Sequence, residues 1–417
     1  MKILMTNHRL LSAGGTEWFI VETARALQSR GHEVAVFTPV GGEMAERLLA
    51  AAIPAVALPR DCPFVPEIIH GQHHLETMAA LAAWPGVPAI YFIHGATPWE
   101  EHPPAHPRIS RYLAPAPRFS NWISRECGVP ETMVEAVRNF FDPDRFPVVR
   151  AQPLAGKRAL VFHNTMESEG EAVAALQAGC ASAGYSLDRA GVAFGNILAE
   201  PGRVLPEYDV VFAAGRSAIE AMACGCGVIP VMARQSAERI HPGNYAEMVD
   251  RNFTAEINAP PMDAANIAGH LRAFRAEEIA EISRRIRAEA TLDATTEHLL
   301  DVYRTALSSP IEHTPEAEAK AVSSYLARLS ARVKDADAAR DRLIDEKDRA
   351  NLRSAKWKKR AETLARSLRS FETEATRAPF WIRRWWRRVR RGGNTQRWAS
   401  SLGEIESRTM NELVRCG

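Results

Sequence analysis

Short apolar segments alternate with segments of helical period along the first 310 residues, and this alternation occurs twice. In the first half the apolar segments are 3–5, 34–37, 68–69 and 89–93. In the second half they are 159–162, 192–194, 209–212 and 228–231. Between the first two, Glu17 to Arg30 has apolar residues at helical spacing and is followed by Gly31, a helix-ending residue. Strands that alternate with helices predict parallel βαβ units, so we expect an α/β fold with doubly wound sheets.

The segment 142–147 contains two prolines and lies between these two halves. We expect it to connect two Rossmann-like domains, 1–150 and 151–310, with a cleft between them. Ligands of open α/β sheets bind beyond the carboxyl ends of the strands. The cleft is therefore the place where chemistry is expected.

The pattern changes in the segment 315–376. Steps of four and three from Val322 to Phe371 meet fifteen positions, of which twelve are apolar, and Arg340, Lys347 and Ser354 interrupt the series. This spacing predicts a long helix with a coiled-coil seam and self-association into a homo-oligomer. The alternative is a single charged helix that lies on the body of the protein.

The C-terminal quarter is basic, whereas the rest of the chain is acidic. Residues 315–417 contain 25 Lys and Arg and 14 Asp and Glu, a net charge of +11, while the remaining residues have a net charge of −9. In a helix over 379–392, one face is apolar and the opposite face consists of arginines. The two faces are Trp381, Ile382, Trp385, Trp386 and Val389, and Arg383, Arg384, Arg387, Arg388, Arg390 and Arg391.

Tryptophan prefers the headgroup boundary of a bilayer, and arginine is attracted to anionic lipids. We therefore predict that the segment 379–392 binds an anionic membrane surface. A nucleic-acid patch would not need a segregated Trp face, so no nucleic-acid partner is expected. The other alternative is a helix packed on the acidic body.

The predicted location is cytoplasmic and peripheral, on the inner face of the membrane. No apolar run reaches the about 20 residues that a spanning helix needs. The six cysteines show no paired spacing, which favours a reducing compartment. The tail 393–417 follows the basic helix.

Two glycine-containing turns carry the candidate chemistry. Gly14 and Gly15 come between the first strand and the first helix, where backbone N–H groups can approach a phosphate closely. A tight turn would use the same glycines.

In the second half, a buried strand leads into Gly215, Arg216 and Ser217, which open a short helix carrying Glu220. Backbone amides and the Arg216 guanidinium could take a diphosphate, and Glu220 could accept hydrogen bonds from a ribose. Alternatively, Glu220 only favours the helix dipole.

These segments occur in an order that resembles the family-4-type glycosyltransferases (glycosyl transferases group 1) of GT-B fold. The resemblance covers about residues 1 to 308. Its motifs are the segments 14–17, 30–34, 68–70, 92–95, 139–146, 219–225 with 228–229, and 299–303. The segment from Ile219 to Gly225 is the most similar.

The resemblance implies transfer of a sugar from a nucleotide diphosphate sugar, held mainly by the second domain, to an acceptor held by the first. It further implies retention of anomeric configuration, with neither cofactor nor metal. Carried over by position, Gly15 would lie against the diphosphate, His94 near the sugar, and Glu220 at the ribose hydroxyls. Phe212 stands where the family commonly has a first glutamate eight positions before Glu220.

The family commonly has an Arg and a Lys for the phosphates after the first strand of the second domain. The corresponding stretch here, 162–170, has neither. Arg216 or Arg9 could replace them. Among the histidines we select His94 alone, because His70, His73 and His74 have no recognised ligand spacing and are expected to be solvated or core residues.

The leading prediction is a glycosyltransferase that acts on a lipid-linked or cell-surface polysaccharide acceptor. The predicted catalytic residues are His94 and Arg216, and the predicted nucleotide-sugar-binding residues are Gly14, Gly15, Gly215, Ser217 and Glu220. The predicted membrane-binding residues are Trp381, Arg383, Arg384, Trp385, Trp386, Arg387 and Arg388. The alternative is a catalytically inactive GT-B scaffold in a membrane-associated polysaccharide assembly.

Overall fold

The computed structural model describes residues 1–96, 99–151, 154–256, 258–259, 261–308 and 314–377. The predicted membrane helix 379–392, with its seven predicted membrane-binding residues, and the tail 393–417 lie outside the described residues. Within those ranges, no helix is both long and apolar enough to cross a membrane.

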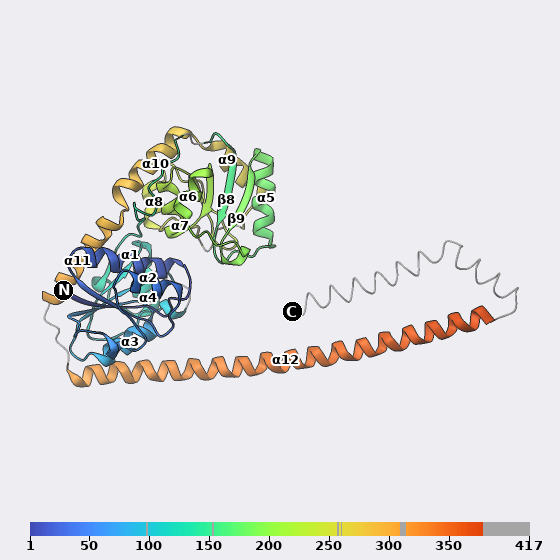
Figure 1. Cartoon of the computed structure of the whole chain (residues 1–417), viewed down its shortest axis with the longest axis horizontal. Coiled ribbons are helices and arrows are strands. Elements are labelled where there is room, and N and C mark those ends of the chain that lie inside the picture. Colours follow the sequence, from blue (N-terminus) through green and yellow to red (C-terminus); the bar gives the residue numbers. More distant parts are fainter. Residues whose placement is uncertain (97–98, 152–153, 257, 260, 309–313, 378–417) are drawn as a thin grey trace. The chain divides into compact units, whose positions relative to one another are not determined.

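The first domain, drawn in blue to cyan in Figure 1, is built on a seven-stranded parallel sheet with the order β3-β2-β1-β4-β5-β6-β7. The strands are β1 (Lys2–Thr6), β2 (Glu33–Phe37), β3 (Ala55–Val56), β4 (Ile68–Gly71), β5 (Ala89–Phe92), β6 (Ile109–Ala114) and β7 (Val134–Ala136). Leu4 of the central strand pairs with Ala35 on one side and Ile69 on the other. The helices are α1 (Gly15–Ser29), α2 (Glu43–Ala50), α3 (His74–Ala83) and α4 (Arg118–Cys127).

The second domain has a four-stranded parallel sheet with the order β11-β10-β8-β9. Its strands are β8 (Arg158–Phe162), β9 (Ser186–Ala190), β10 (Val210–Ala213) and β11 (Gly227–Pro230). Its helices are α5 (Glu171–Ala183), α6 (Pro201–Val204), α7 (Gly215–Ala223), α8 (Tyr245–Asp250), α9 (Ala264–Ala273) and α10 (Ala276–Glu289). Short 3-10 helices are η1 (Pro59–Asp61), η2 (Trp99–Glu101), η3 (Glu131–Met133), η4 (Val192–Phe194) and η5 (Leu205–Glu207).

Successive residues of the second sheet enter different hydrophobic clusters. Leu160 and Val211 belong to one cluster, and Val161 and Phe212 belong to the other. Because side chains alternate between the faces of a strand, both faces of this sheet are covered. The predicted α/β fold with two Rossmann-like domains is thus confirmed.

The strand predicted at 192–194 is wrong. Val192–Phe194 forms the 3-10 turn η4, bounded by Gly191 and Gly195 at φ angles of 139° and 64°. The strand is the preceding segment β9, which lies at the edge of the sheet and has largely exposed residues. An edge strand needs little apolar sequence, so the polar segment 186–190 gave no strand signal.

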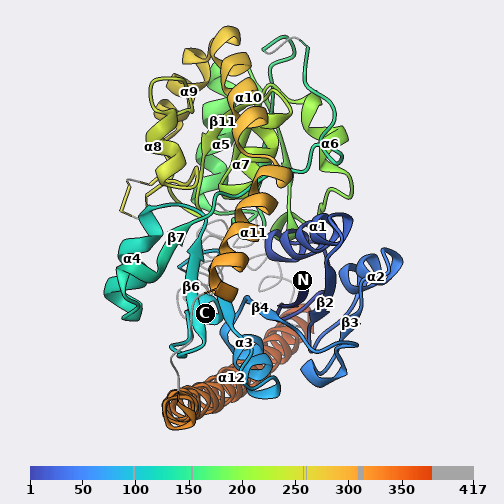
Figure 2. The ribbon, with the colours of Figure 1, turned by 90° about the vertical axis from the view of Figure 1, so that its left-hand side faces the viewer.

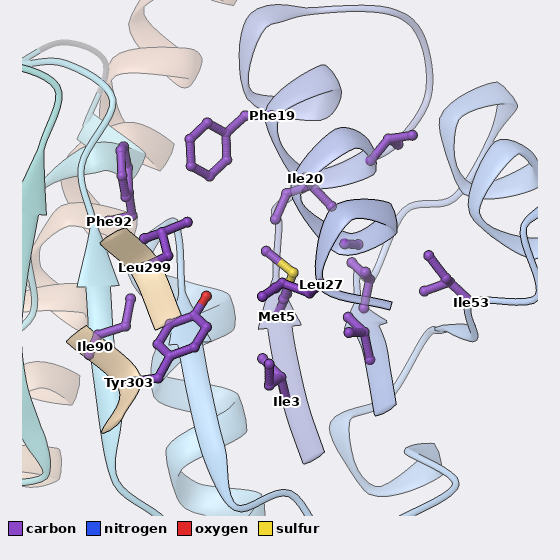
Figure 3. Close-up of a cluster of buried hydrophobic side chains, with 14 of the residues drawn as sticks. Ile3, Met5, Phe19, Ile20, Leu27, Ile53, Ile90, Phe92, Leu299 and Tyr303 are labelled. Atoms are coloured by element: carbon purple, nitrogen blue, oxygen red, sulfur yellow. The ribbon is translucent and has the colours of Figure 1, made fainter. Parts of the chain in front are cut away.

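The helix α11 (Leu292–Ser308) completes the core of the first domain, although it follows the second domain in sequence (Figure 2). Its Leu299 and Tyr303 lie beside Ile90 and Phe92 of β5 (Figure 3). The chain therefore crosses between the two sheets twice. The bounds 1–150 and 151–310 stay a prediction.

The helix α12 (Pro315–Arg377) begins on the first domain. The Arg108 Nε donates to Glu318 Oε2 at 3.0 Å, and the hydroxyl of Tyr325 lies 2.7 Å from His74 Nδ1. From Ala327 onward the helix belongs to a unit of its own. Seam residues there, among them Val333, Leu343, Trp357 and Leu364, are exposed. Self-association through this seam stays a prediction.

Candidate active site

A small cavity of about 80 Å³ lies between the two Rossmann-like domains. It brings together five of the sequence-predicted site residues, which are Gly14, Gly15, Arg216, Ser217 and Glu220. Residues that the sequence analysis did not select also line it, including Trp18, Arg145, His163 and Gly191. The described part of the chain therefore assembles most of the predicted nucleotide-sugar site in one place.

The first wall of the cavity is the start of α1. Gly15 is the first residue of this helix, so its N–H is among those without an intrahelical partner. A Cβ added at Gly15 would meet no atom within 4 Å, which leaves open space beside the backbone. At Gly14 the carboxylate of Glu17 fills the corresponding space. Gly15 therefore offers the backbone surface that a phosphate can approach.

The second wall is the start of α7. The buried strand β10 ends at Ala213, and Gly215 takes a φ of 56°, which only glycine adopts without strain. Gly215 itself does not line the cavity, but Arg216 and Ser217 in the first turn do. Glu220 follows one turn later and is buried. Gly215 therefore acts through the turn rather than through contact with the cavity.

The guanidinium of Arg216 is held by two carboxylates from different domains. Its Nε donates to Glu220 Oε1 at 3.0 Å, and its Nη2 donates to Glu22 Oε2 of α1. The guanidinium lies 4.8 Å from the centre of the Phe140 ring. The side chain is only 9% exposed, and its Nη1 has no hydrogen-bond partner among the described residues. One donor of this cation is thus buried and unsatisfied in the described structure.

Burial and the neighbouring charges act in opposite directions on this group of side chains. Burial tends to lower the pKa of Arg216, but Glu22 and Glu220 raise it above its ordinary value. Burial raises the pKa of Glu220, while Arg216 and Arg145 oppose that rise. Arg216 therefore remains a cation on the cavity wall.

Arg145 is a second cation on the wall, to which the sequence analysis gave no role. Its Nη1 donates to Glu22 Oε1, and its guanidinium lies 3.5 Å from the centre of the Trp18 ring. Glu22 thus joins Arg145 and Arg216 through its two oxygens. The sequence contained one signal for this contact. Glu22 lies at a position of α1 that faces the protein interior, where acidic residues are rare.

His94 does not line the cavity. Its Nε2 lies 2.8 Å from Gln72 Oε1, and its backbone N–H donates to Glu101 Oε2 at 2.9 Å. Phe19 contacts its ring at a centroid distance of 4.8 Å and also contacts Phe140. Burial lowers the pKa of His94 to about 4, so its imidazole is neutral at pH 7.

The other three histidines of this region are buried and contact different residues. Of the two expectations, solvated or core residues, the structure confirms the second. His70 contacts Tyr303, and His74 contacts Tyr325. His73 Nδ1 accepts a hydrogen bond from the His8 backbone N–H at 3.3 Å. None of the three lines the cavity.

The structure also shows where the positions lie at which this sequence departs from the family pattern. Phe212 is fully buried in a hydrophobic cluster, so this position cannot contribute to the cavity. Arg9 is exposed and does not line it. Phe162, His163 and Asn164 line it in place of the missing Arg and Lys. In the described chain, the cationic side chains on the wall are therefore Arg145 and Arg216.

Comparison with known proteins agrees with this fold. Residues 13–145 match the family model Glycosyltransferase Family 4. No curated protein sequence matches the chain. A glycosyltransferase from Rickettsia africae has a similar structure, with 15% identity, a TM-score of 0.54, and coverage of 74% of this chain and 99% of that one.

Two further solved structures are similar. Anabaena HepE, solved in complex with UDP-glucose, is 14% identical with a TM-score of 0.55, over 73% of this chain and 100% of that chain. Sucrose-phosphate synthase from Thermosynechococcus elongatus is 13% identical with a TM-score of 0.50, over 74% and 100%. The family match over residues 13–145 and the similar structures confirm the predicted resemblance to the family-4-type glycosyltransferases and their fold, and they agree with the prediction of a glycosyltransferase.

Proposed function

We propose that this glycosyltransferase takes its sugar from a nucleotide diphosphate sugar bound at the cavity between α1 and α7. The observation that carries the proposal is the meeting of two helix starts and a buried cation at one cavity: Gly15, Ser217 and Arg216 all line it. Helix starts and arginines both favour phosphate. The structure of Anabaena HepE with UDP-glucose supports a donor of this class.

The chemistry required is stabilisation of the leaving diphosphate, whose negative charge grows as the bond to the sugar breaks. The free Nη1 of Arg216 and the backbone N–H groups at the start of α7 are suited to this role. Glu220, one turn further along α7, would accept hydrogen bonds from ribose hydroxyls. His94, with its neutral ring, is proposed to contact the sugar, although it does not line the cavity.

The reaction proposed here retains the anomeric configuration and uses neither metal nor cofactor. The proposed acceptor is a lipid-linked or cell-surface polysaccharide, since a membrane-binding tail would bring the enzyme to such an acceptor. Analysis of the product by NMR determines its anomeric configuration. Activity measured after chelation of divalent metal ions shows whether the reaction requires a metal. An inverted product or a chelator-sensitive rate would contradict the respective statement.

Thermal unfolding of the full chain against nucleoside diphosphates and their sugars tests the donor proposal. A ligand at 100 times its dissociation constant adds about 2.7 kcal/mol of stability, which raises the unfolding midpoint visibly. Stabilisation by one nucleotide, and consumption of its sugar conjugate, would support the proposal. A folded protein that responds to none would instead favour the inactive scaffold.

Replacing Gly15 with alanine should reduce this stabilisation without affecting the empty protein. The added methyl meets no protein atom within 4 Å, and alanine suits the first turn of a helix. The methyl would instead occupy space next to the backbone that the diphosphate needs. We expect an unchanged unfolding midpoint without ligand and at least a tenfold weaker nucleotide affinity. A Gly15→Ala variant that binds nucleotide like the wild type would contradict the placement of the diphosphate.

The segment 379–392 is proposed to bind anionic membranes. Removing the four arginines Arg383, Arg384, Arg387 and Arg388 should cost about 1 kcal/mol each, so vesicle affinity should fall roughly a thousandfold. Co-sedimentation of the full chain with phosphatidylglycerol-containing vesicles measures it. A matched control neutralises four exposed basic residues of α12 and should change affinity much less. These are Lys356, Lys358, Lys359 and Arg360.

A variant with alanine at Trp381, Trp385 and Trp386 distinguishes a membrane target from a nucleic-acid target. The Trp variant should lose vesicle binding in high salt, because the apolar face supplies the part that salt does not screen. Wild-type binding that high salt abolishes to the same extent as binding of the Trp variant would be electrostatic only and would contradict the membrane helix.

We propose that the chain forms homo-oligomers through self-association of α12. The exposed apolar seam beyond residue 326 has no partner within the described chain, and burying it would be favourable. Sedimentation equilibrium of the full chain measures its mass, with Leu343→Lys as the variant. A monomer at micromolar concentration, or an oligomer unaffected by Leu343→Lys, would contradict this seam.

A further inference from the structure

Resting on the donor proposal above, we infer that Arg145 and Arg216 together bind the donor diphosphate, and that Glu22 occupies both guanidinium groups while the cavity is empty. A diphosphate carries at least two negative charges, and Arg216 supplies one positive charge. The described wall contains one other cation, Arg145, since the stretch 162–170 has no Arg or Lys.

The contacts of Glu22 are those of a substitute for phosphate. Its two carboxylate oxygens each accept a hydrogen bond from a different guanidinium, Oε1 from Arg145 and Oε2 from Arg216. An oxyanion between two arginines is also the arrangement in which a phosphate is bound. Glu22 lies behind the cavity wall, and its side chain is only 2% exposed. Both guanidinium groups are therefore already positioned around an anion.

Aromatic rings hold the two arginines in this position. Trp18 lies 3.5 Å from the guanidinium of Arg145, and Phe140 lies 4.8 Å from that of Arg216. Stacked arginines lose little side-chain entropy when a ligand binds, because their rotamers are already fixed. Trp18 and Arg145 both line the cavity, so this preorganised pair faces the ligand space.

Binding of a diphosphate to both guanidinium groups requires a change at the cavity. The contact between Glu22 of α1 and Arg216 of α7 joins two of its walls, so it must loosen. Glu22 then competes with the diphosphate for both cations, which lowers donor affinity.

The experiment measures binding of inorganic pyrophosphate, and of the stabilising nucleoside diphosphate, to the full chain by calorimetry. Arg145→Ala should weaken both at least tenfold. Glu22→Gln should tighten both about tenfold, even though its unfolding midpoint without ligand falls. Arg203→Ala is the matched control: it removes an exposed arginine of the neighbouring cavity, paired with Glu200, and should leave both affinities unchanged.

Arg145→Lys keeps the charge but not the two-pronged contact, and it serves if Arg145→Ala does not fold. We expect an affinity between those of the wild type and the alanine variant. Pyrophosphate binding that is equal in the wild type, Arg145→Ala or Arg145→Lys, and Glu22→Gln would overturn the inference. Weaker binding by Glu22→Gln would overturn the competition.

These results are separable from a failure of the donor proposal. If the wild type consumes a nucleotide sugar while the Arg145 and Glu22 variants bind pyrophosphate unchanged, the inference is wrong and the donor proposal stands. If the folded wild type neither binds pyrophosphate or any nucleotide nor consumes any donor, both are wrong.

Discussion

Replacing Arg216 with alanine is expected to lower the turnover of glycosyl transfer by about 10²- to 10³-fold, the usual effect of removing one preorganised donor at a developing charge. Arg216 lines the cavity, its Nη1 has no protein partner among the described residues, and burial strengthens its interaction with a ligand anion. The measurement is the steady-state rate with the donor that stabilises the protein. Turnover within twofold of the wild type would show that the leaving group is stabilised elsewhere.

The same substitution leaves Glu22 and Glu220 without their shared cation, so a loss of stability must be separated from a loss of chemistry. Unpaired buried carboxylates cost several kcal/mol, although Glu22 keeps Arg145. Adding Glu22→Gln to Arg216→Ala removes one of these charges. We expect the double variant to regain part of the unfolding midpoint and none of the turnover. Recovery of turnover together with stability would make Arg216 a structural residue.

Arg216→Lys provides a second separation. A lysine keeps one positive charge but cannot hold Glu22, Glu220 and a phosphate at once, because it lacks the planar fork of donors. Turnover between that of the wild type and that of Arg216→Ala is expected, with stability close to the wild type. Equal turnover of the lysine and wild-type enzymes would mean that charge alone suffices.

The residues that sequence could place are those whose role is local. A strand followed by glycine and then a helix defines the position of Gly15, and the same order defines Ser217 and Glu220 on α7. These positions follow from the path of the chain over a few residues. All of them line the cavity, as expected for turns at the carboxyl ends of parallel strands. The roles assigned to them stay predictions.

The residues that sequence did not place depend on contacts between distant segments. The bridge of Glu22 to Arg145 and Arg216 joins α1, the connection between the domains, and α7. No spacing in the sequence encodes such a bridge. His94 was placed near the sugar by resemblance, yet it does not line the cavity. Its position relative to the donor depends on how the cavity opens.

A similar long-range contact explains the largest expected loss of stability, which follows from replacing Arg108 with methionine. Arg108 is 1% exposed and donates from Nη1 to the carbonyl oxygens of Trp84 and Val87 at 2.7 and 2.8 Å, and from Nη2 to that of Leu81. Its guanidinium thus satisfies carbonyls at the end of α3, where a cation is favoured by the helix dipole. Methionine would remove all these contacts and the one with Glu318, although the Trp84 carbonyl keeps the Val87 N–H and Glu318 keeps the contact with His106.

We expect Arg108→Met to lower the free energy of unfolding by about 3–5 kcal/mol, as for other buried ion pairs that lose one member. Denaturant unfolding of the full chain measures it. The matched control is Arg111→Met on the same strand, since Arg111 is half-buried and bonds only the neighbouring Ser110 carbonyl among the contacts described. A difference of less than about 1 kcal/mol between the two variants would contradict the prediction.

The contact with Glu318 makes the start of α12 part of this balance. Glu318→Gln keeps an acceptor for the Arg108 Nε but removes the charge that offsets burial, and burial already lowers the pKa of Arg108. We expect this variant to lose about 1–2 kcal/mol, less than Arg108→Met, because the carbonyl contacts remain. A chain ending at Leu326 should keep full stability, whereas one ending at Ser308 should lose at least as much as Glu318→Gln. Equal stability of the two shortened chains would show that the first turns of α12 do not stabilise the first domain.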